Sequence, residues 1–246
     1  MGIDKDIIVA GDIHGMWRYL NTLINKKKPK YILQVGDFGW WPRQHVKSRK
    51  PRIHHGMKYR PFDQYGLKVG KTEVFWCPGN HEDWEELELR KAIPSEIMPN
   101  VFYMRRGSTI QLADGRIILF MGGALSIDRN SRTAGIDWFP QEIIPYSEIY
   151  KLEHNEVDKV DIVVSHTCPL EFEPKLRDKI PYNGWEYKFE DPSQQVLSTI
   201  LDMYKPSLWY FGHFHIHMEG QYDNTKWFCM NDVPNTKWWR YLDNGD

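Results

Sequence analysis

Residues 79–82, Gly-Asn-His-Glu, constrain the fold of this chain more than any other stretch. The apolar run 74–77 precedes them and the charged, helix-like run 83–87 follows them, so Asn80 and His81 are predicted to lie at the carboxyl end of a strand. Open α/β sheets place their functional residues at that edge. The pattern therefore predicts an α/β fold with a polar site around Asn80.

Four further segments follow the same pattern, because each places polar side chains directly after an apolar run. In three of them a glycine stands before the polar residue, which allows backbone and metal to approach closely. Since parallel strands end at one edge of a sheet, the loops that follow them are predicted to converge. The candidate metal ligands that these segments contribute, together with Asn80, are Asp12, His14, Asp37, His166, His213 and His215.

The spacing and chemistry of these ligands indicate a pair of metal ions. Asp12 and His14 lie two residues apart, as do His213 and His215, and in an extended segment this spacing points both side chains to the same side. Oxygen and imidazole ligands without sulfur suit manganese, iron, zinc, cobalt or nickel, and the set is too rich in nitrogen for calcium. We expect two divalent transition-metal ions, Mn²⁺ in the first place and Fe, Zn, Ni or Co as alternatives.

Two residues are expected to have special roles at such a centre. Cations held roughly 3.5 to 4 Å apart repel each other, so a carboxylate has to bridge them, and a hydroxide that both share becomes a nucleophile at neutral pH. Asp37 is the expected bridge, because it stands alone on its loop without an adjacent histidine. His81 follows the ligand Asn80, so its side chain is expected to point toward the leaving group or the charge that develops on a phosphoryl oxygen.

The rest of the chain alternates strand-like and helix-like runs, which predicts a mixed α/β domain that begins with a βαβ unit. An antiparallel hairpin is expected at Asp114-Gly115, and an N-cap at Asp191 before a proline. Strands are expected at 7–10, 31–35, 101–104, 109–112, 116–121, 161–165 and 208–211, helices at 17–28, 84–92, 147–157 and beyond 191, and closing strands of a second sheet at 225–230 and 238–241.

Residues 1–246 fit one large domain, interrupted by irregular segments at about 40–72 and about 124–145. The second segment is a candidate wall of the site, and its residues Arg129 and Arg132 are candidate substrate contacts, because a guanidinium matches two phosphoryl oxygens. The first segment is either a solvated loop or a cap over an anionic site. Its basic residues are Arg43, Lys47, Arg49, Lys50, Arg52, Lys58 and Arg60.

Composition excludes several other classes. The net charge of -1 gives no global preference for nucleic acid or membranes. Three cysteines without CxxC spacing argue against a disulfide framework and a thiolate zinc site. No apolar run approaches the roughly 18 residues that span a bilayer, and the residues before the first strand lack a basic region followed by an apolar core, so we expect no signal peptide. We therefore expect a cytoplasmic protein without a membrane partner.

In chain order, the segments 11–15, 36–37, 79–82, 165–166 and 212–215 resemble the motifs of the calcineurin-like metallophosphoesterases. The resemblance extends from residue 7 to about residue 220 and implies a four-layer αββα sandwich with two mixed β-sheets and a metal site at the strand carboxyl ends. It implies His81 as the transition-state histidine. It also implies one metal on Asp12, His14, Asp37 and His215, and the other on Asp37, Asn80, His166 and His213.

Two departures bear on the branch of the family. Glu82 is typical of the protein serine/threonine phosphatases, whereas many phosphodiesterases have aspartate there. After Asp37, however, the chain lacks the Asp-Arg-Gly of that branch, and residues 212–215 are similar to the general phosphoesterases. We expect a binuclear hydrolase of phosphate esters, first a phosphodiesterase acting on nucleotides or nucleic acid. The alternatives are a phosphomonoesterase or protein serine/threonine phosphatase, and a non-catalytic interaction module on the same fold.

Overall fold

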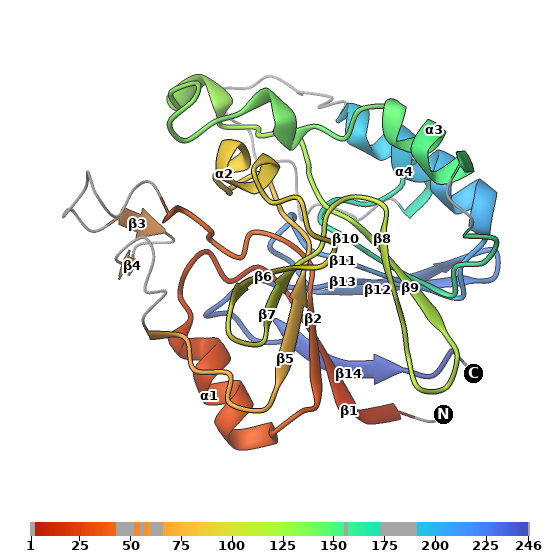
Figure 1. The fold of residues 1–246 in the computed structure, drawn as a ribbon, viewed down its shortest axis with the longest axis horizontal. Coiled ribbons are helices and arrows are strands. Elements are labelled where there is room, and N and C mark those ends of the chain that lie inside the picture. Colours follow the sequence, from red (N-terminus) through yellow and green to blue (C-terminus); the bar gives the residue numbers. More distant parts are fainter. Residues whose placement is uncertain are drawn as a thin grey trace.

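The computed structural model describes residues 3–42, 52–54, 57–59, 66–154, 157–172 and 191–245. Two six-stranded mixed sheets pack face to face, and helices cover their outer faces (Figure 1). This arrangement confirms the predicted four-layer αββα sandwich. Both sheets have four parallel strands in the middle and one antiparallel strand on each edge.

The first sheet has the order β14-β1-β2-β5-β7-β6. Its first and last strands in the chain are neighbours, because β14 pairs antiparallel with β1. Its strands are β1 (Ile3–Ala10), β2 (Tyr31–Gln34), β5 (Glu73–Trp76), β6 (Ser95–Met98), β7 (Val101–Tyr103) and β14 (Trp239–Asp243).

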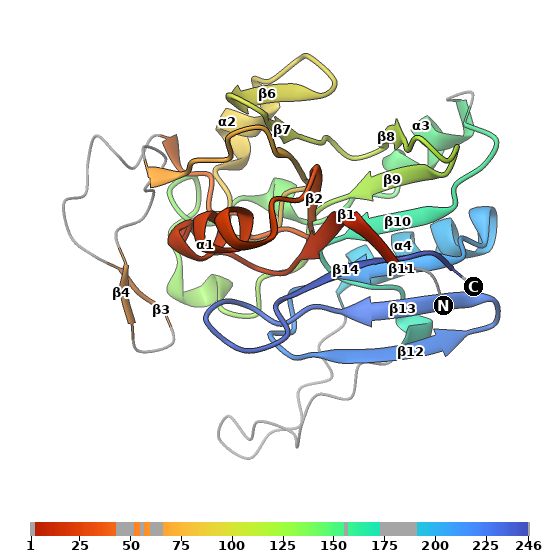
Figure 2. The same ribbon diagram turned by 90° about the horizontal axis from the view of Figure 1, so that it is seen from below.

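The second sheet has the order β12-β13-β11-β10-β9-β8. Figure 2 shows this sheet from the edge strand β12 to the edge strand β8. Its strands are β8 (Ser108–Gln111), β9 (Ile117–Met121), β10 (Ile162–Ser165), β11 (Leu208–Phe211), β12 (Met218–Tyr222) and β13 (Thr225–Cys229). A separate hairpin joins β3 (Arg52–His54) to β4 (Met57–Tyr59).

Successive side chains along a strand point to opposite faces of the sheet, so the buried apolar side chains fall into three cores. On β1, Ile7 and Val9 belong to the core between the two sheets, whereas Ile8 packs toward α1 (Arg18–Lys27). On β10, Ile162 faces the core between the sheets and Val163 packs with the helices on the other side. Both sheets are therefore apolar on two faces, and polar residues gather at the strand ends.

The helices begin and end where local chemistry satisfies their free backbone groups. Asp191 caps α4 (Pro192–Tyr204) by accepting the N–H of Ser193, as predicted. α1 ends at Lys27, and the following residue Lys28 caps it with a left-handed backbone and donates its N–H to the carbonyl of Ile24. The other helices are α2 (Trp84–Glu88), α3 (Ser147–His154) and the 3₁₀ turns η3 (Arg129–Ser131), η4 (Pro140–Glu142) and η5 (Leu170–Phe172).

Several predicted elements were wrong in extent or place. α2 ends at Glu88 rather than at residue 92, because the chain turns toward Pro94 and the edge strand β6. Residues 238–241 were expected in the second sheet, but β14 lies in the first. The edge strands β6 and β12 and the β3–β4 hairpin were missed, since edge strands carry a weaker apolar pattern.

Three further predictions concern membrane-spanning helices, the extent of the domain and the basic segment. No helix in the described ranges is long and apolar enough to cross a membrane. The single-domain extent stays a prediction. The basic residues Arg43, Lys47, Arg49, Lys50 and Arg60, and the side chains of Arg52 and Lys58, lie outside the described residues.

The burial of Ile162 of β10 in the core between the sheets predicts how much stability is lost when its side chain is truncated. Ile162→Ala should lower the free energy of unfolding by about 3 kcal/mol, because Ile162 is fully buried between both sheets and the cavity cannot collapse completely. Denaturant titration followed by circular dichroism measures this change. Ile127 is 70% exposed, so Ile127→Ala is the control and should change stability by less than about 0.5 kcal/mol. Equal effects of the two variants would contradict this account of the core.

Candidate metal centre

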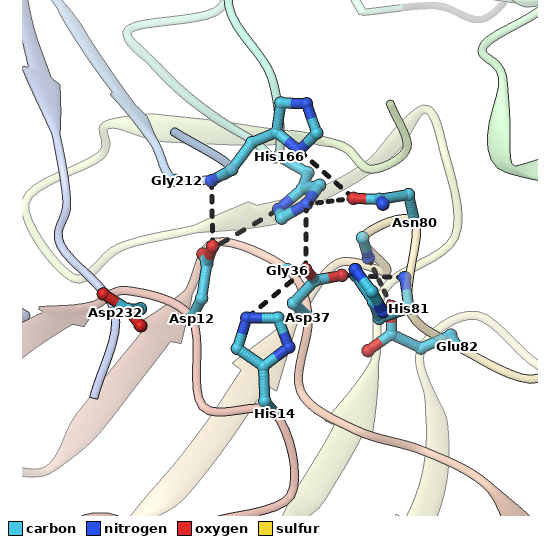
Figure 3. A network of polar contacts seen from close by, with 12 residues as sticks. Asp12, His14, Gly36, Asp37, Asn80, His81, Glu82, His166, Gly212 and Asp232 are labelled. Carbon is cyan, nitrogen blue, oxygen red and sulfur yellow. Dashed lines mark hydrogen bonds and ion pairs between the residues drawn. The ribbon is translucent and has the colours of Figure 1, made fainter. Parts of the chain in front are cut away.

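The loops that follow five strands bring all the candidate ligands to one place, from both sheets. Figure 3 labels five of these ligands, Asp12, His14, Asp37, Asn80 and His166. β1, β2 and β5 of the first sheet precede Asp12 with His14, Asp37, and Asn80, respectively. β10 and β11 of the second sheet precede His166 and the pair His213 and His215. The convergence that the sequence predicts is therefore present in the structure.

Asp12, His14, Asp37 and His215 form a first group that could hold one metal ion, since one ligand atom of each lies within 4.8 Å of the others. His14 Nε2 lies 3.1 Å from His215 Nε2 and 3.6 Å from Asp37 Oδ2. His215 Nε2 lies 3.3 Å from Asp12 Oδ2. Two ring nitrogens this close repel each other unless a proton or a cation lies between them.

A second group surrounds the amide oxygen of Asn80. Asn80 Oδ1 lies 2.9 Å from His166 Nε2 and 3.1 Å from His213 Nδ1. His166 Nε2 also lies 3.4 Å from Asp37 Oδ2, the same oxygen that faces His14 in the first group. One atom of Asp37 is therefore common to both groups.

The charges at the centre fit cations. Burial by itself would raise the pKa of Asp37, but the imidazoles of His166, His81 and His14 hold that pKa well below its usual range. Burial would lower the pKa of His166, yet the negative charge of Asp37 and its hydrogen bond raise it to about 10. The buried carboxylate thus requires positive charge on several sides.

Asp12 gives an independent sign that the donor set fits a cation. Its Oδ1 is buried and has no hydrogen-bond partner in the part of the chain that the structure describes. His166 Nδ1 is 3.9 Å from this oxygen and lies 3.0 Å from the carbonyl of Val35. Burial raises the pKa of Asp12, because nothing nearby fully compensates its charge.

Residues behind the ligands fix which atoms face the centre. His166 Nδ1 donates to the carbonyl of Val35, which leaves Nε2 for Asn80 and Asp37. The amide nitrogen of Asn80 donates to Ser126 Oγ at 3.0 Å, so its oxygen faces the two histidines. Sequence reasoning missed Ser126, because nothing in its immediate neighbourhood distinguishes it from other serines in loops.

Glu82 joins the two loops that carry the candidate ligands Asp37 and Asn80, both of which follow strands of the first sheet. Its carboxyl oxygens accept the backbone N–H groups of Gly39 at 2.9 Å and Gly79 at 2.6 Å. Burial, followed by the charge of Asp37, raises the pKa of Glu82 to about 8. The sequence identified this residue as a branch marker and missed its structural role.

Indole groups of two tryptophans support the same loops. Trp17 Nε1 donates to the carbonyl of Phe38 at 3.1 Å, and Trp84 Nε1 donates to the carbonyl of Gly79 at 3.2 Å. Both indoles are buried in the core beneath the loops. The loops are therefore held by apolar packing and hydrogen bonds together.

The backbone that presents the ligands differs from the predicted extended conformation. Four candidate ligands have left-handed backbones, with φ of 47° at His14, 51° at Asp37, 68° at His213 and 51° at His215. Each costs about 1 kcal/mol or more for a residue with a side chain. The two-residue spacing therefore brings the side chains together through tight turns, which only the surrounding hydrogen bonds make stable. His14 N–H, for example, donates to the carbonyl of Asp37 at 2.6 Å.

Glycines let the ligand loops pack against one another. A Cβ on Gly79 would overlap Asp37 Oδ1, and a Cβ on Gly212 would overlap Asp12 Oδ1. The sequence predicted close approach of a metal to the backbone at these glycines. In the structure the close neighbours are the carboxylates of Asp37 and Asp12 from adjacent loops.

The arginines of the wall lie in different places. Arg132 reaches the centre, where its Nη2 lies 2.6 Å from His81 Nε2 and its Nη1 donates to the carbonyl of Asn80. Arg129 instead lies with its guanidinium 5.5 Å from the centroid of the Trp138 ring. Burial lowers the pKa of His81 to about 4, although the charge of Asp37 acts in the opposite direction.

One buried acid near His215 was also missed. Asp232 lies in the loop between β13 and β14, and its Oδ2 is 3.9 Å from His215 Nδ1. Its other oxygen accepts from the amide of Asn235 at 2.7 Å. Nothing in the sequence near Asp232 relates it to the motif at 212–215, because the two segments meet only in the folded chain.

Comparison with known proteins identifies the family. The profile of the calcineurin-like phosphoesterases matches residues 5–217. The chain therefore belongs to the calcineurin-like phosphoesterases, which makes it a metallophosphoesterase, a hydrolase of phosphoric esters. The resemblance found in the sequence is confirmed.

Solved structures share the fold at low sequence identity. The protein TT1561 of Thermus thermophilus is 14% identical with a TM-score of 0.52, over 92% of this chain and 88% of that chain. Another structure is 15% identical with a TM-score of 0.58, over 96% and 94%. No curated protein sequence matches significantly.

The role of Glu82 can be tested through stability. Glu82→Ala leaves the buried N–H groups of Gly39 and Gly79 without their acceptor, so the free energy of unfolding should fall by about 2 to 5 kcal/mol. Glu88→Ala is the matched control, because Glu88 is exposed and has a weak contact of 3.4 Å with Gln141. Thermal unfolding of the metal-free proteins measures both changes. A loss at residue 82 no larger than that at residue 88 would show that the carboxylate does not hold the loops.

Proposed function

We propose that this protein is a phosphodiesterase that uses two divalent transition-metal ions, Mn²⁺ in the first place, to hydrolyse nucleotides or nucleic acid. The observation that carries this proposal is the position of Asp37 Oδ2, 3.6 Å from His14 Nε2 and 3.4 Å from His166 Nε2. A single carboxylate oxygen between two sets of ligands is what a pair of adjacent cations needs.

The ligands divide into two sets that share Asp37. When bound, the ions supply Lewis acidity to the phosphoryl oxygens and lower the pKa of water. The protein's part is to hold the ligand atoms in place, through Val35 behind His166 and Ser126 behind Asn80. One set is Asp12, His14, Asp37 and His215, and the other is Asp37, Asn80, His166 and His213.

His81 is proposed as the residue that acts on the substrate beside these ligands. Its backbone N–H donates to Asp37 Oδ1 at 2.8 Å, which places it next to the shared carboxylate without making its ring a ligand. Its ring lies at the edge of the first group, with its centroid 5.2 Å from that of His14. From there the ring can donate a proton or a hydrogen bond to an oxygen of the substrate.

The charge of the wall favours a diester over a monoester. A monoester phosphate carries about -1.5 to -2 charges near neutral pH, whereas a diester carries one. Arg132 lies 2.5 Å from the carboxylate of Asp128, so this ion pair adds no net positive charge beside His81. A singly charged phosphodiester needs less compensation, and this supports the diesterase over the phosphomonoesterase and the protein phosphatase.

Loss of the shared carboxylate should remove metal. Asp37→Asn should lower the bound metal from two ions per chain to one or none and abolish turnover, because the neutral amide cannot offset two adjacent positive charges. Elemental analysis after dialysis against Mn²⁺ measures the content. Asp114→Asn is the control and should keep both ions, since Asp114 lies in the β8–β9 turn and pairs with Arg116. Two ions retained in Asp37→Asn would remove the bridging role.

Loss of His81 should affect turnover and leave metal binding unchanged. His81→Asn should bind both ions and lower kcat by roughly 10² to 10⁴ on an aryl phosphodiester, the range for a positioned acid or charge stabiliser. The wild-type protein should hydrolyse the aryl diester with a higher kcat/KM than the aryl monoester. A preference for the monoester would overturn the diesterase assignment, and loss of metal from His81→Asn would give His81 a different role.

A further inference from the structure

The segments that form α1 and β14 carry basic residues without acidic ones between them. Residues 13–36, which include α1, contain no aspartate or glutamate, and neither do residues 233–242, which include most of β14. Their basic residues are Arg18, Lys26, Lys27, Lys28, Lys30, Lys237 and Arg240. Since the whole chain has a net charge of -1, these segments form a local basic surface on a nearly neutral protein.

The lysines at the end of α1 keep their charge available for a ligand. Lys26 and Lys28 are exposed and Lys27 is half-buried. In the ranges that the structure describes, none of the three forms an ion pair, whereas Arg240 lies 3.1 Å from Glu219. Cations in the last turn of a helix also stabilise its dipole, but that effect does not explain the aromatic rings beside them.

Two aromatic rings of β14 lie next to these lysines. The Nζ of Lys27 lies 5.1 Å from the centroid of the Trp239 ring and 5.8 Å from that of Tyr241. The two rings meet edge to face, with their centroids 5.6 Å apart, and both are half-buried. Partly exposed rings beside ammonium groups are the combination that binds unpaired bases together with their phosphates.

Both elements begin beside the metal centre. Just before α1, the indole of Trp17 donates to the carbonyl of Phe38 in one of the ligand loops. Just before β14, the carbonyl of Trp238 accepts the N–H of Gly11 at 2.6 Å in another. Between residues 18 and 26 the helix rises about 12 Å, which is the length of about three stacked nucleotides at 3.4 Å each.

We propose that the α1–β14 face, residues 18–28 and 239–241, binds single-stranded nucleic acid, with the lysines on phosphates and the rings of Trp239 and Tyr241 against unpaired bases. The bases of a duplex are already paired and stacked, so they offer no free face to an aromatic ring. The binding stands apart from the reaction. Its consequence, that the diester substrate is a strand of several nucleotides and not a mononucleotide, rests on the proposed function.

An anionic membrane is the other polyanion that a basic face could meet. Helices that lie on membranes insert large apolar side chains into the interface. The exposed residues of α1 are instead polar or basic, and neither α1 nor the described part of β14 has an exposed large apolar side chain. These exposed residues of α1 are Arg18, Thr22, Asn25 and Lys26. The surface chemistry therefore favours nucleic acid.

Fluorescence anisotropy of the metal-free full chain tests the lysines, with a labelled oligothymidylate of about 20 nucleotides as the probe. Lys26→Gln/Lys27→Gln/Lys28→Gln should raise Kd about 10-fold or more and reduce the slope of log Kd against log salt concentration by about 2, since each phosphate contact contributes about 0.7. The control Lys91→Gln/Lys151→Gln/Lys205→Gln removes the same charge from exposed lysines elsewhere and should change neither value. Equal effects of the two triple variants, or no binding by the wild type, would overturn the proposal.

The rings are tested with the same probe. Trp239→Leu and Tyr241→Leu should each weaken binding about 5- to 100-fold with the salt slope unchanged, the range for loss of a stacked base. Tyr146→Leu is the control, because Tyr146 is 65% exposed just before α3. An abasic strand of the same length should bind the wild type more weakly than the oligothymidylate. Equal affinity of the wild type for the two strands overturns the proposal even if neither leucine variant folds.

Two further measurements separate this surface from its alternatives. Vesicles of phosphatidylserine and phosphatidylcholine should not compete with the oligonucleotide, and competition would make the face a lipid surface and overturn the proposal. With Mn²⁺ added, the triple variant at residues 26–28 should raise the KM for oligonucleotide hydrolysis by a larger factor than the KM for an aryl diester. Equal factors would overturn the assignment of a strand as the substrate.

The binding surface and the proposed function can fail separately. Binding of the oligonucleotide by this face without hydrolysis of any diester would refute the proposed function and keep the surface. Hydrolysis of diesters without this binding would refute the surface and keep the proposed function.

Discussion

The buried carboxylate of Asp37 lies between imidazoles that come from two different sheets. His14 approaches its Oδ2 from the first sheet and His166 approaches the same atom from the second, while Oδ1 accepts the backbone N–H of His81. A carboxylate removed from water is unfavourable unless positive charge surrounds it. The packing of one sheet on the other supplies that charge, so the centre exists only when the sandwich is assembled.

The loops around Asp37 are held in conformations that they would not adopt alone. Left-handed backbones at His14 and His213 are unfavourable locally, and glycines such as Gly79 leave no space for a side chain beside a neighbouring ligand. Glu82 and the buried indoles stabilise these loops through backbone hydrogen bonds. The rigidity of the two sheets thus offsets strain at the site, which keeps ligand atoms in place before any ion binds.

The wall segment after β9 orients the neighbouring pair Asn80 and His81 from one side. Ser126 accepts from the amide of Asn80, and Arg132 contacts the carbonyl between the two residues and the ring of His81. Ser126 is itself held by Glu142, whose Oε1 accepts its backbone N–H at 2.9 Å. A segment that looks irregular in sequence is therefore ordered by polar contacts, and its conformation matters to the chemistry of its neighbours.

The sequence by itself determined which polar residues follow the buried strands and which family the chain belongs to, because an apolar run followed by glycine and a polar residue is a local signal. The α/β sandwich and the convergence of Asp12 with Asp37 followed from the handedness of βαβ connections. Only the tertiary structure decided that β14 joins the first sheet, that Ser126 orients Asn80, and that Arg132 contacts His81. These contacts join residues far apart in the chain, and a hydrogen-bond partner is selected by distance in the folded molecule, which local sequence patterns do not specify.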